Sequence, residues 1–399
     1  MVKFFAATDR EVAEGRTTDI YFEHTLKVLE KKGLLGVDTV SEFTVGGLPD
    51  GWEWGVLCGT EEVIRLLEGK DIDLWGIPEG SVFKARTQEG IRTPILRIEG
   101  SYGEYCPFET PALGFICYSS GVATMSARCK LASGFRTVMS FGVRRMHPAL
   151  APVIDRSSYI GGCDSVSSII GGETIRKDPT GTMPHALVLM MGDQRKAFEA
   201  FDELIDGKVR RVALIDTFSD EKAEAMIACE SVKDLYAVRL DTPGSRRGDL
   251  ADIIREVRWE MDLRGYGHVR IFVSGGLSDT DLPRLVKAGA DGFGIGTSIS
   301  NAPTIDFSMD IVEKAGHPLS KRGKCSGSKR TFRCNKCLEY SARTEGMEAP
   351  ICHRCGTKME LFEVKLLERG RRVVSEESAS DIRDRVIQQL RTLQGLAGG

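Results

Sequence analysis

Four of the eleven cysteines occur as two Cys-X2-Cys pairs in the C-terminal quarter of the chain. Cys334 and Cys337 form the first pair, Cys352 and Cys355 form the second, and fourteen residues separate the pairs. Four thiolates at this spacing match the tetrahedral coordination that zinc prefers. Because sulfur would fill every position and leave none for water, we predict a structural Zn²⁺ in a zinc knuckle of about residues 330–360. A disulfide pair is the alternative.

Glycines follow two neighbouring apolar runs, IFVSGG over 271–276 and GFGIGTS over 292–298. Glycine allows backbone N–H groups to approach an anion closely, and a helix that starts after each run would add a favourable dipole. The pattern is typical of the phosphate site that follows the last two strands of an eight-fold βα barrel. These two strand ends therefore predict a phosphate site.

Polar or glycine residues end five consecutive apolar runs, which cover 138–142, 212–217, 236–242, 271–276 and 292–296. In a βα barrel, the carboxyl ends of the strands build the active site. For one strand alone, turn or helix-capping roles would explain such residues. Five strands that end in this way favour a catalytic site.

The alternation of strands with helices indicates an α/β fold. Helices expected over 250–264 and 282–288 connect the last strands, which implies a parallel sheet, closed as an irregular βα barrel or open, within residues 111–300. Residues 1–110 predict an N-terminal α+β, sandwich-like domain with an antiparallel sheet and a helix over 19–32. Residues 301–399 would form a C-terminal segment with the zinc knuckle, a strand at 361–367 and a helix at 375–394.

Composition is that of an ordinary globular protein, with 41% hydrophobic and 28% charged residues and a net charge of −3. This charge does not favour nucleic acid, so the pairs Arg144-Arg145 and Arg246-Arg247 are expected to be anion ligands or solvated surface. The N-terminus lacks a signal-peptide pattern, and no run approaches the roughly 20 apolar residues of a membrane span. We expect a cytoplasmic protein with no membrane partner. The seven scattered cysteines are expected to be mostly buried free thiols.

Several segments, in order along the chain, resemble the nicotinate phosphoribosyltransferases of the type II family, which have an irregular α/β barrel. They are TDIYFEHT (18–25), SFGVRRMHP (140–148), GGCDSVSS (161–168), GTMPHAL (181–187), LIDTF (214–218), VRLDTPGSRRGD (238–249) and SGGL (274–277). The resemblance extends from about residue 8 to about residue 320 and is strongest to the shorter archaeal-type members.

The resemblance implies roles in binding the pyridine substrate. Tyr21 and Phe141 would sandwich the ring, because flat π faces favour offset stacking. Arg144 and Arg239 would orient the nicotinate carboxylate and the phosphoribosyl group, since guanidinium suits bidentate oxyanion contacts. Thr182 would add a hydrogen bond to the pyridine substrate.

The resemblance also implies which residues would bind phosphoribosyl pyrophosphate. Asp241 would face the ribose hydroxyls and stabilise positive charge at the anomeric carbon, and Asp216 would contact ribose or magnesium. Mg²⁺ is expected to be held chiefly by the pyrophosphate, with few protein ligands. The 5′-phosphate cradle would come from Gly275, Gly276, Gly296 and Thr297. Ser274, which precedes the first glycine pair, is expected to bind substrate.

Two residues leave alternatives open. His185 matches a histidine that related transferases phosphorylate with ATP; otherwise it would hydrogen-bond substrate or a carboxylate. Asp164 would accept a hydrogen bond from the amide if the substrate were nicotinamide; otherwise it would cap a turn or hold an arginine.

The expected activity is an ATP-coupled or ATP-independent transfer from phosphoribosyl pyrophosphate to nicotinate, which gives nicotinate mononucleotide and pyrophosphate in NAD salvage. Nicotinamide and quinolinate are alternative acceptors. In relatives the tyrosine matching Tyr21 reaches the neighbouring subunit, so a homodimer or higher oligomer with shared active sites is expected. The alternative of another class is a zinc-ribbon binding protein on an inactive barrel. Basic residues around the knuckle would then bind a nucleic acid or another partner: Lys329, Arg330, Arg333, Lys336, Arg354 and Lys358.

Overall fold

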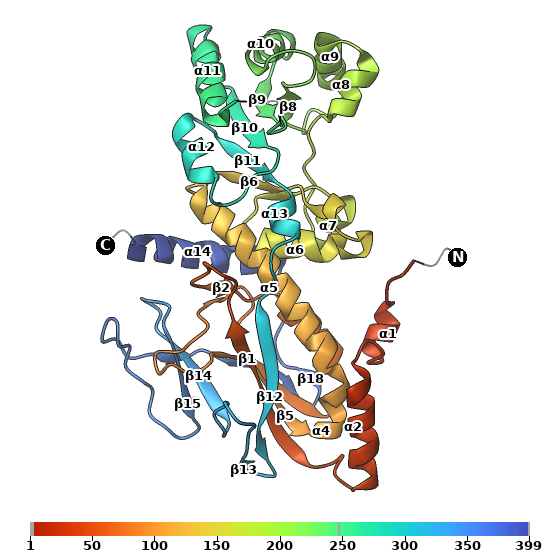
Figure 1. Ribbon diagram of the computed structural model, residues 1–399, viewed down its shortest axis with the longest axis vertical. Helices are drawn as coiled ribbons and strands as arrows, with labels where there is room; N and C mark the ends of the chain where they lie inside the picture. The colour runs from red at the N-terminus through yellow and green to blue at the C-terminus, as the bar shows by residue number, and fades with distance from the viewer. Residues whose placement is uncertain (1–3, 246–247, 398–399) are drawn as a thin grey trace. The chain divides into compact units, whose positions relative to one another are not determined.

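The computed structural model describes residues 4–245 and 248–397 (Figure 1). By compactness it divides into two units, one formed by Met1–Thr124 with Pro303–Gly399 and the other by Met125–Ala302. We call them the sheet unit and the half-barrel unit. The Arg246-Arg247 pair lies outside the described residues.

The half-barrel unit is built on a six-stranded parallel sheet with the order β7-β6-β11-β10-β9-β8. The strands are β6 (Thr137–Ser140), β7 (Ser165–Val166), β8 (Arg211–Leu214), β9 (Leu235–Leu240), β10 (Arg270–Ser274) and β11 (Gly292–Ile295). Within the described ranges the edge strands β7 and β8 do not pair with each other, so the sheet is a half-barrel. The parallel α/β architecture expected from the sequence is confirmed, and its open form is the one adopted.

Helices connect these strands. They are α6 (Ala151–Ile160), α7 (Ile169–Ile175), α8 (His185–Met191), α9 (Gln194–Leu204), α10 (Glu221–Ser231), α11 (Leu250–Leu263), α12 (Leu282–Ala288) and α13 (Thr297–Ser300), with short 3-10 turns η2 (Val143–Arg145) and η3 (Pro148–Leu150). The apolar period of α11 buries Leu250, Ile254, Val257 and Met261, while Asp249 caps its first turn. The helices expected near 250–264 and 282–288 are confirmed.

The sheet unit contains a seven-stranded antiparallel sheet with the order β13-β12-β1-β5-β3-β17-β18. These strands are β1 (Asp38–Gly47), β3 (Ile72–Gly76), β5 (Pro94–Ser101), β12 (Asp306–Lys314), β13 (His317–Pro318), β17 (Val364–Glu368) and β18 (Arg371–Arg372). Phe43 and Val45 of β1 belong to the core formed with α3 (Thr60–Leu67) and with α5 (Glu109–Ala132), which continues into the half-barrel unit. Strand side chains alternate between faces, so Glu42 and Thr44 lie on the other face.

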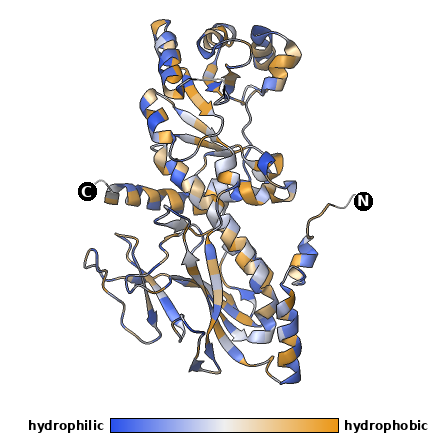
Figure 2. Ribbon diagram, in the orientation of Figure 1, coloured by the Kyte–Doolittle hydropathy of each residue, from blue (hydrophilic) through white to orange (hydrophobic). Residues whose placement is uncertain are grey.

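The remaining elements of this unit are short, apart from the helices α2 and α14. They are α1 (Asp9–Ala13), α2 (Ile20–Lys31), α4 (Tyr102–Tyr105), η1 (Cys106–Phe108), α14 (Ala379–Ala397), the pair β2 (Gly55–Val56) and β4 (Val82–Phe83), and the sheet β15-β14-β16 of β14 (Lys329–Arg333), β15 (Tyr340–Thr344) and β16 (Glu360–Leu361). Helix α14 alternates apolar and polar residues along its length (Figure 2) and buries Ile382, Val386 and Leu390.

The C-terminal segment does not form a compact unit of its own, because β17 pairs with β3 of the N-terminal region, with Val364 opposite Gly76. The expected boundaries of the segments 1–110, 111–300 and 301–399 stay a prediction. Of the seven scattered cysteines, Cys117 is half-buried, Cys325 is exposed and the other five are buried. None of the described helices is both long and apolar enough to cross a membrane.

Candidate active site at the carboxyl ends of the half-barrel strands

The carboxylate of Asp216 is the centre of a hydrogen-bond network beyond β8 and β9. Its side chain is 1% exposed, and Oδ1 lies 3.0 Å from Nε2 of His185. Its Oδ2 accepts the N–H of Asp241 at 2.8 Å and the hydroxyl of Thr242 at 3.1 Å. Burial raises the pKa of Asp216, and His185 together with these hydrogen bonds opposes the increase. Both oxygens are therefore occupied within the chain, and Asp216 connects His185 to the end of β9.

Asp241 is positioned from the neighbouring strand β10. The hydroxyl of Ser274 donates to Oδ1 of Asp241 at 2.9 Å. Gly275 and Gly276 follow with φ of +94° and +70°, which favours glycine, and a Cβ on Gly275 would lie 3.2 Å from Oδ1 of Asp241. Apart from its chain neighbours, no described residue has an atom within 4 Å of a Cβ built on Gly276. The β10 end thus closes around Asp241 and leaves open space beside Gly276.

Arg239 places a buried guanidinium group inside this site. The residue is 8% exposed, and its Nη2 donates to the carbonyl oxygen of Met183 at 3.2 Å. Its Nη2 also lies 4.0 Å from Oδ2 of Asp241, whereas its Nε has no hydrogen-bond partner in the described part of the chain. Burial lowers the pKa of Arg239 and the nearby Arg144 adds to this, while Asp241 and Asp216 oppose it. A buried guanidinium with an unused donor is suited to an anionic ligand.

Phe141 provides an aromatic face next to this cation. The Arg239 guanidinium carbon lies 6.0 Å from the centre of the Phe141 ring. The ring crosses the backbone of β11 so closely that a Cβ on Gly294 would come within 2.4 Å of it. Gly142 is equally constrained, since a Cβ there would lie 2.7 Å from the carbonyl oxygen of Gly296. Gly294 of β11 therefore makes room for the Phe141 ring.

The helix predicted directly after Gly276 is not present. Instead, Ser278 and Asp281 form a hydrogen-bonded turn, with the Ser278 N–H 2.8 Å from Oδ2 of Asp281, and α12 begins only at Leu282. A helix does start after Gly296, but α13 is only four residues long. The residues expected to contact an anion therefore lie in a turn and at one short helix, and not at the starts of two helices.

The structure brings together most of the residues singled out from the sequence. Arg144 lies on η2, exposed and near enough to Arg239 to influence its pKa. Thr182, partly buried, precedes Met183, whose carbonyl oxygen contacts Arg239. The group comprises residues at or just beyond the carboxyl ends of the strands, with Thr182 and His185 from the segment at the start of α8: Phe141, Arg144, Thr182, His185, Asp216, Arg239, Asp241, Ser274, Gly275, Gly276, Gly296 and Thr297.

Asp164 is not part of this group. Its Oδ2 accepts from Nζ of Lys130 at 2.7 Å and from the N–H of Val138 at 2.8 Å, near the amino end of β6. Asp164 therefore pairs with a lysine, whereas the partners expected from the sequence were a substrate amide, a turn or an arginine. Tyr21 lies on α2 of the sheet unit, where it is 54% exposed and its hydroxyl lies 3.3 Å from Oδ2 of Asp19.

Two buried carboxylates that support the site were not predicted. Glu224 is fully buried and accepts the N–H groups of Thr217, Phe218 and Ser219 at 2.9, 2.6 and 2.7 Å, which fixes the loop after Asp216. Asp155, equally buried, accepts the Ser168 hydroxyl at 2.5 Å. Both residues lie on helices, where a carboxylate in the sequence is usually solvated, so the sequence carried no signal for them.

The four cysteines of the sheet unit form one cluster, with all four Sγ atoms within 4.8 Å of one another. The Sγ atoms of Cys334 and Cys355 are 3.5 Å apart. Zinc–sulfur bonds of about 2.3 Å in a tetrahedron would place sulfurs about 3.8 Å apart, so the cluster fits zinc. The predicted metal-ligand set is supported.

Several of the basic residues around this cluster form ion pairs or stack on an aromatic ring. Lys329 pairs with Glu42 at 3.0 Å and Arg330 pairs with Glu363 at 2.9 Å. The guanidinium group of Arg333 stacks 3.6 Å from the centre of the Phe362 ring. These pairings reduce the cationic surface that a nucleic acid would need.

Comparisons with known proteins agree on one family. Models of the quinolinate phosphoribosyl transferase N-terminal and C-terminal domains match residues 19–120 and 122–310. The structure of a nicotinate-nucleotide pyrophosphorylase from Pyrococcus furiosus has 44% sequence identity and a TM-score of 0.94, over 99% of each chain. A nicotinate phosphoribosyltransferase of Mycobacterium tuberculosis is 25% identical over 97% of this chain and 93% of its own length. The human nicotinic acid phosphoribosyltransferase, at 19% identity and a TM-score of 0.74 over 94% of each chain, shares the fold.

Proposed function

The chain belongs to the type II phosphoribosyltransferase family, and on this premise we propose that it transfers the phosphoribosyl group of phosphoribosyl pyrophosphate to nicotinate. The pyridine nitrogen forms a bond to C1 of the ribose, the bond from C1 to the pyrophosphate oxygen breaks, and pyrophosphate leaves with the bonding electrons. The product is nicotinate mononucleotide, a precursor of NAD. The observation that carries this proposal is the buried Arg239, whose Nε is unpartnered in the described residues, beside the ring of Phe141.

A planar aromatic acid with one carboxylate matches these groups. Phe141 would stack on one face of the pyridine, and Arg239 with Arg144 would bind the carboxylate and the phosphoribosyl group. Thr182 would donate a hydrogen bond from the segment that also supplies the Met183 carbonyl to Arg239. Tyr21 would cover the second face of the ring from a neighbouring subunit of a homodimer.

Asp241 would stabilise the positive charge that develops on the ribose as pyrophosphate departs. Ser274 orients its Oδ1, which leaves Oδ2 toward Arg239 and the substrate. Gly275, Gly276, Gly296 and Thr297 would bind the 5′-phosphate through backbone N–H groups. Since both oxygens of Asp216 already accept hydrogen bonds, Mg²⁺ would be bound mainly by the pyrophosphate.

His185 would accept a phosphoryl group from ATP at Nδ1. Its Nε2 faces Oδ1 of Asp216, so an N–H on Nε2 leaves the lone pair of Nδ1 for attack. Phosphorylation would form the Nδ1–P bond while the bond to ADP breaks. Hydrolysis of the phosphohistidine in the course of transfer would couple ATP to product formation.

The choice of acceptor rests on charge. A nicotinamide amide would be recognised by a free carboxylate, and the candidate for that role, Asp164, is bound by Lys130 and Val138. Quinolinate has two carboxylates and needs more cations than Arg144 and Arg239 supply. It remains the named rival because the matching family models carry its name.

Steady-state assays with nicotinate, nicotinamide and quinolinate, each with phosphoribosyl pyrophosphate and with or without ATP, test the proposal. Nicotinate should give the highest kcat/KM. Arg239→Gln should lower that value by about a hundredfold, as expected for loss of a buried charged contact of about 3 kcal/mol. Asp164→Asn is the matched control for acceptor choice and should keep the preference for nicotinate. Faster turnover of quinolinate, with release of carbon dioxide, would overturn the assignment.

A further inference from the structure

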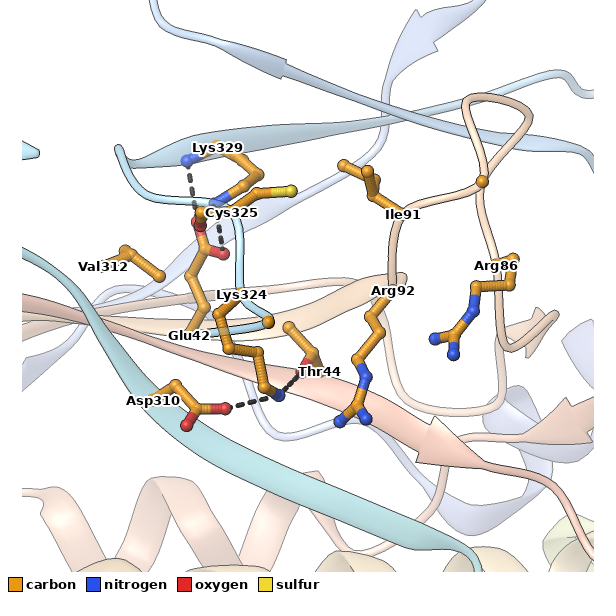
Figure 3. A pocket seen from close by; sticks show the side chains of 12 residues that line it. Glu42, Thr44, Arg86, Ile91, Arg92, Asp310, Val312, Lys324, Cys325 and Lys329 are labelled. Carbon is orange, nitrogen blue, oxygen red and sulfur yellow. Dashed lines mark hydrogen bonds and ion pairs between the residues drawn. The ribbon is translucent and has the colours of Figure 1, made fainter. Parts of the chain in front are cut away.

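A polar cavity of about 300 Å³ lies within the sheet unit (Figure 3). It is on the face of β1 opposite the apolar core, between β12, the segment 323–329 and a hairpin over 86–92. Its charged lining residues are Arg86, Arg92, Lys324, Lys329, Glu42 and Asp310. Four cations therefore face two carboxylates.

Both carboxylates are already neutralised by lysines. Glu42 accepts from Nζ of Lys329 at 3.0 Å, and its other oxygen accepts the N–H of the same residue at 2.8 Å. Asp310 pairs through one oxygen with Lys321 and through the other with Lys324, each at 2.5 Å. No negative charge of the lining is left for the two arginines.

Arg86 and Arg92 lack an acidic partner among the described residues. Arg92 makes one long contact, from Nη1 to the Ser308 hydroxyl at 3.5 Å. The two arginines are direct partners in an antiparallel bridge, and the hairpin is closed by the Thr87 N–H, which donates to the carbonyl oxygen of Ile91 at 2.9 Å. Directly opposed like charges destabilise a strand pair. Figure 3 shows the Arg86 side chain extending toward that of Arg92, so a bound anion would relieve this repulsion.

The cysteine cluster supports the hairpin that carries these arginines. Gln88, at the hairpin turn, donates from Nε2 to the carbonyl oxygen of Ile351 at 3.0 Å and accepts the N–H of His353 at 3.1 Å. These two residues flank the metal ligand Cys352. The Gln88 N–H also donates to the carbonyl oxygen of Tyr340 at 2.8 Å. The metal-binding turns therefore hold the hairpin in place.

We propose that this cavity is a binding site for a small phosphate-type oxyanion, with Arg86 and Arg92 as its main ligands and Lys324 at its floor. Guanidinium groups bind phosphate oxygens in pairs, and Lys324 already reaches Thr44 at 3.3 Å within the cavity. The volume is at the lower end for ligand pockets, which suits a phosphate or diphosphate group. The site consists of residues of the sheet unit and is separate from the residues assigned to catalysis.

Cys325 lines the cavity and is exposed, so it provides a local probe. The experiment measures the rate at which iodoacetamide alkylates Cys325 of the zinc-loaded full chain, followed by peptide mass spectrometry at constant pH and ionic strength. Inorganic phosphate, pyrophosphate, ADP and chloride are compared. Pyrophosphate at about ten times its dissociation constant should slow alkylation about tenfold by mass action. Slowing by phosphate or pyrophosphate identifies a free anion, and slowing by ADP alone identifies the diphosphate of a nucleotide.

Arg86→Gln/Arg92→Gln should abolish the slowing. Arg322→Gln, at an exposed arginine that does not line the cavity, is the charge-matched control and should retain it. Arg239→Gln should also retain it, which separates this site from the active site. Arg86→Gln alone should raise the Tm of the anion-free protein, because it removes the opposed charge. No slowing in the wild type, equal slowing in the double variant, or a lower Tm of Arg86→Gln would each overturn the proposal.

Discussion

The imidazole of His185 is held by Asp216, with 3.0 Å between Nε2 and Oδ1. The carboxylate is almost completely buried, whereas the histidine side chain is 38% exposed. Asp216 is also fixed by the N–H of Asp241, so the ring orientation is tied to the end of β9. This arrangement leaves Nδ1 as the nitrogen available to a substrate and makes Asp216 a positioning residue.

Phosphorylation of His185 is the first prediction from this geometry. Incubation with ATP labelled at the γ-phosphate should give an acid-labile, base-stable adduct, and His185→Asn should abolish it. Asp216→Asn should reduce its yield at least about tenfold, because an amide cannot accept from both His185 and the Asp241 N–H in the same way. His147→Asn, which changes an exposed histidine, is the control and should keep the adduct. A wild type with neither an adduct nor ATP stimulation would restrict His185 to substrate positioning.

Glu109 gives a prediction for stability against pH. Burial, followed by the nearby Asp310, raises its pKa to about 7 from the ordinary value of 4.5. Between these two pH values the folded state binds more protons than the unfolded state, so this group makes stability decrease as pH rises through the window. The contribution is fully present below about pH 4.5 and is lost above about pH 7, a difference of about 3 kcal/mol.

Glu109→Gln removes this titration while it keeps the size of the side chain. The Tm of the variant minus that of the wild type should therefore increase from pH 5 to pH 8. Glu104→Gln, at an exposed glutamate nearby, is the matched control for the loss of one carboxylate. Differential scanning calorimetry at four pH values measures both differences. A Glu109→Gln difference that does not change with pH would show that the carboxyl ionises normally.

Zinc is predicted to stabilise the sheet unit. Metal analysis should find about one zinc per chain, since four thiolates complete one tetrahedral site. Cys334→Ser should lower Tm, because zinc present at about a thousand times its dissociation constant contributes about 4 kcal/mol to the folded state. Cys325→Ser, at an exposed cysteine outside the cluster, should leave the zinc content unchanged. Metal-free protein with four freely reactive thiols in the cluster would contradict this prediction.

Local sequence predicted those parts of the fold that depend on local physics. The apolar runs gave strands β6 and β8 to β11, and the 3.6-residue period gave α11. The pairing of β6 with β11, with Val138 opposite Phe293, joins segments more than 150 residues apart in the chain, so neither the strand order nor the open edges follow from any single segment. The same applies to β17, which joins the sheet of the N-terminal region beside β3.

The residues of the candidate site also divide into those that local sequence predicted and those that depend on tertiary contacts. Asp216 and Asp164 both follow apolar or small residues in motifs of the family, but Asp216 lies beyond the carboxyl end of β8 and Asp164 lies near the amino end of β6. Asp164 is bound by Lys130 and by the N–H of Val138, which are tertiary contacts that the sequence does not reveal. Glu224 was not predicted because its three N–H partners are supplied by the conformation of the loop, which has no sequence pattern of its own.

The last prediction is that two subunits share each active site. Tyr21 belongs to the sheet unit, is 54% exposed and would exclude water from the pyridine face of a neighbouring subunit, whereas Arg239 belongs to the half-barrel unit. Tyr21→Ala and Arg239→Ala should each be nearly inactive alone. After random subunit mixing, half of the two-fold dimers combine the two variants and contain one intact site, so about a quarter of all sites should regain activity. Activity no higher than that of either variant, in a mixture whose subunits demonstrably exchange, would show that Tyr21 acts within its own chain or not at all.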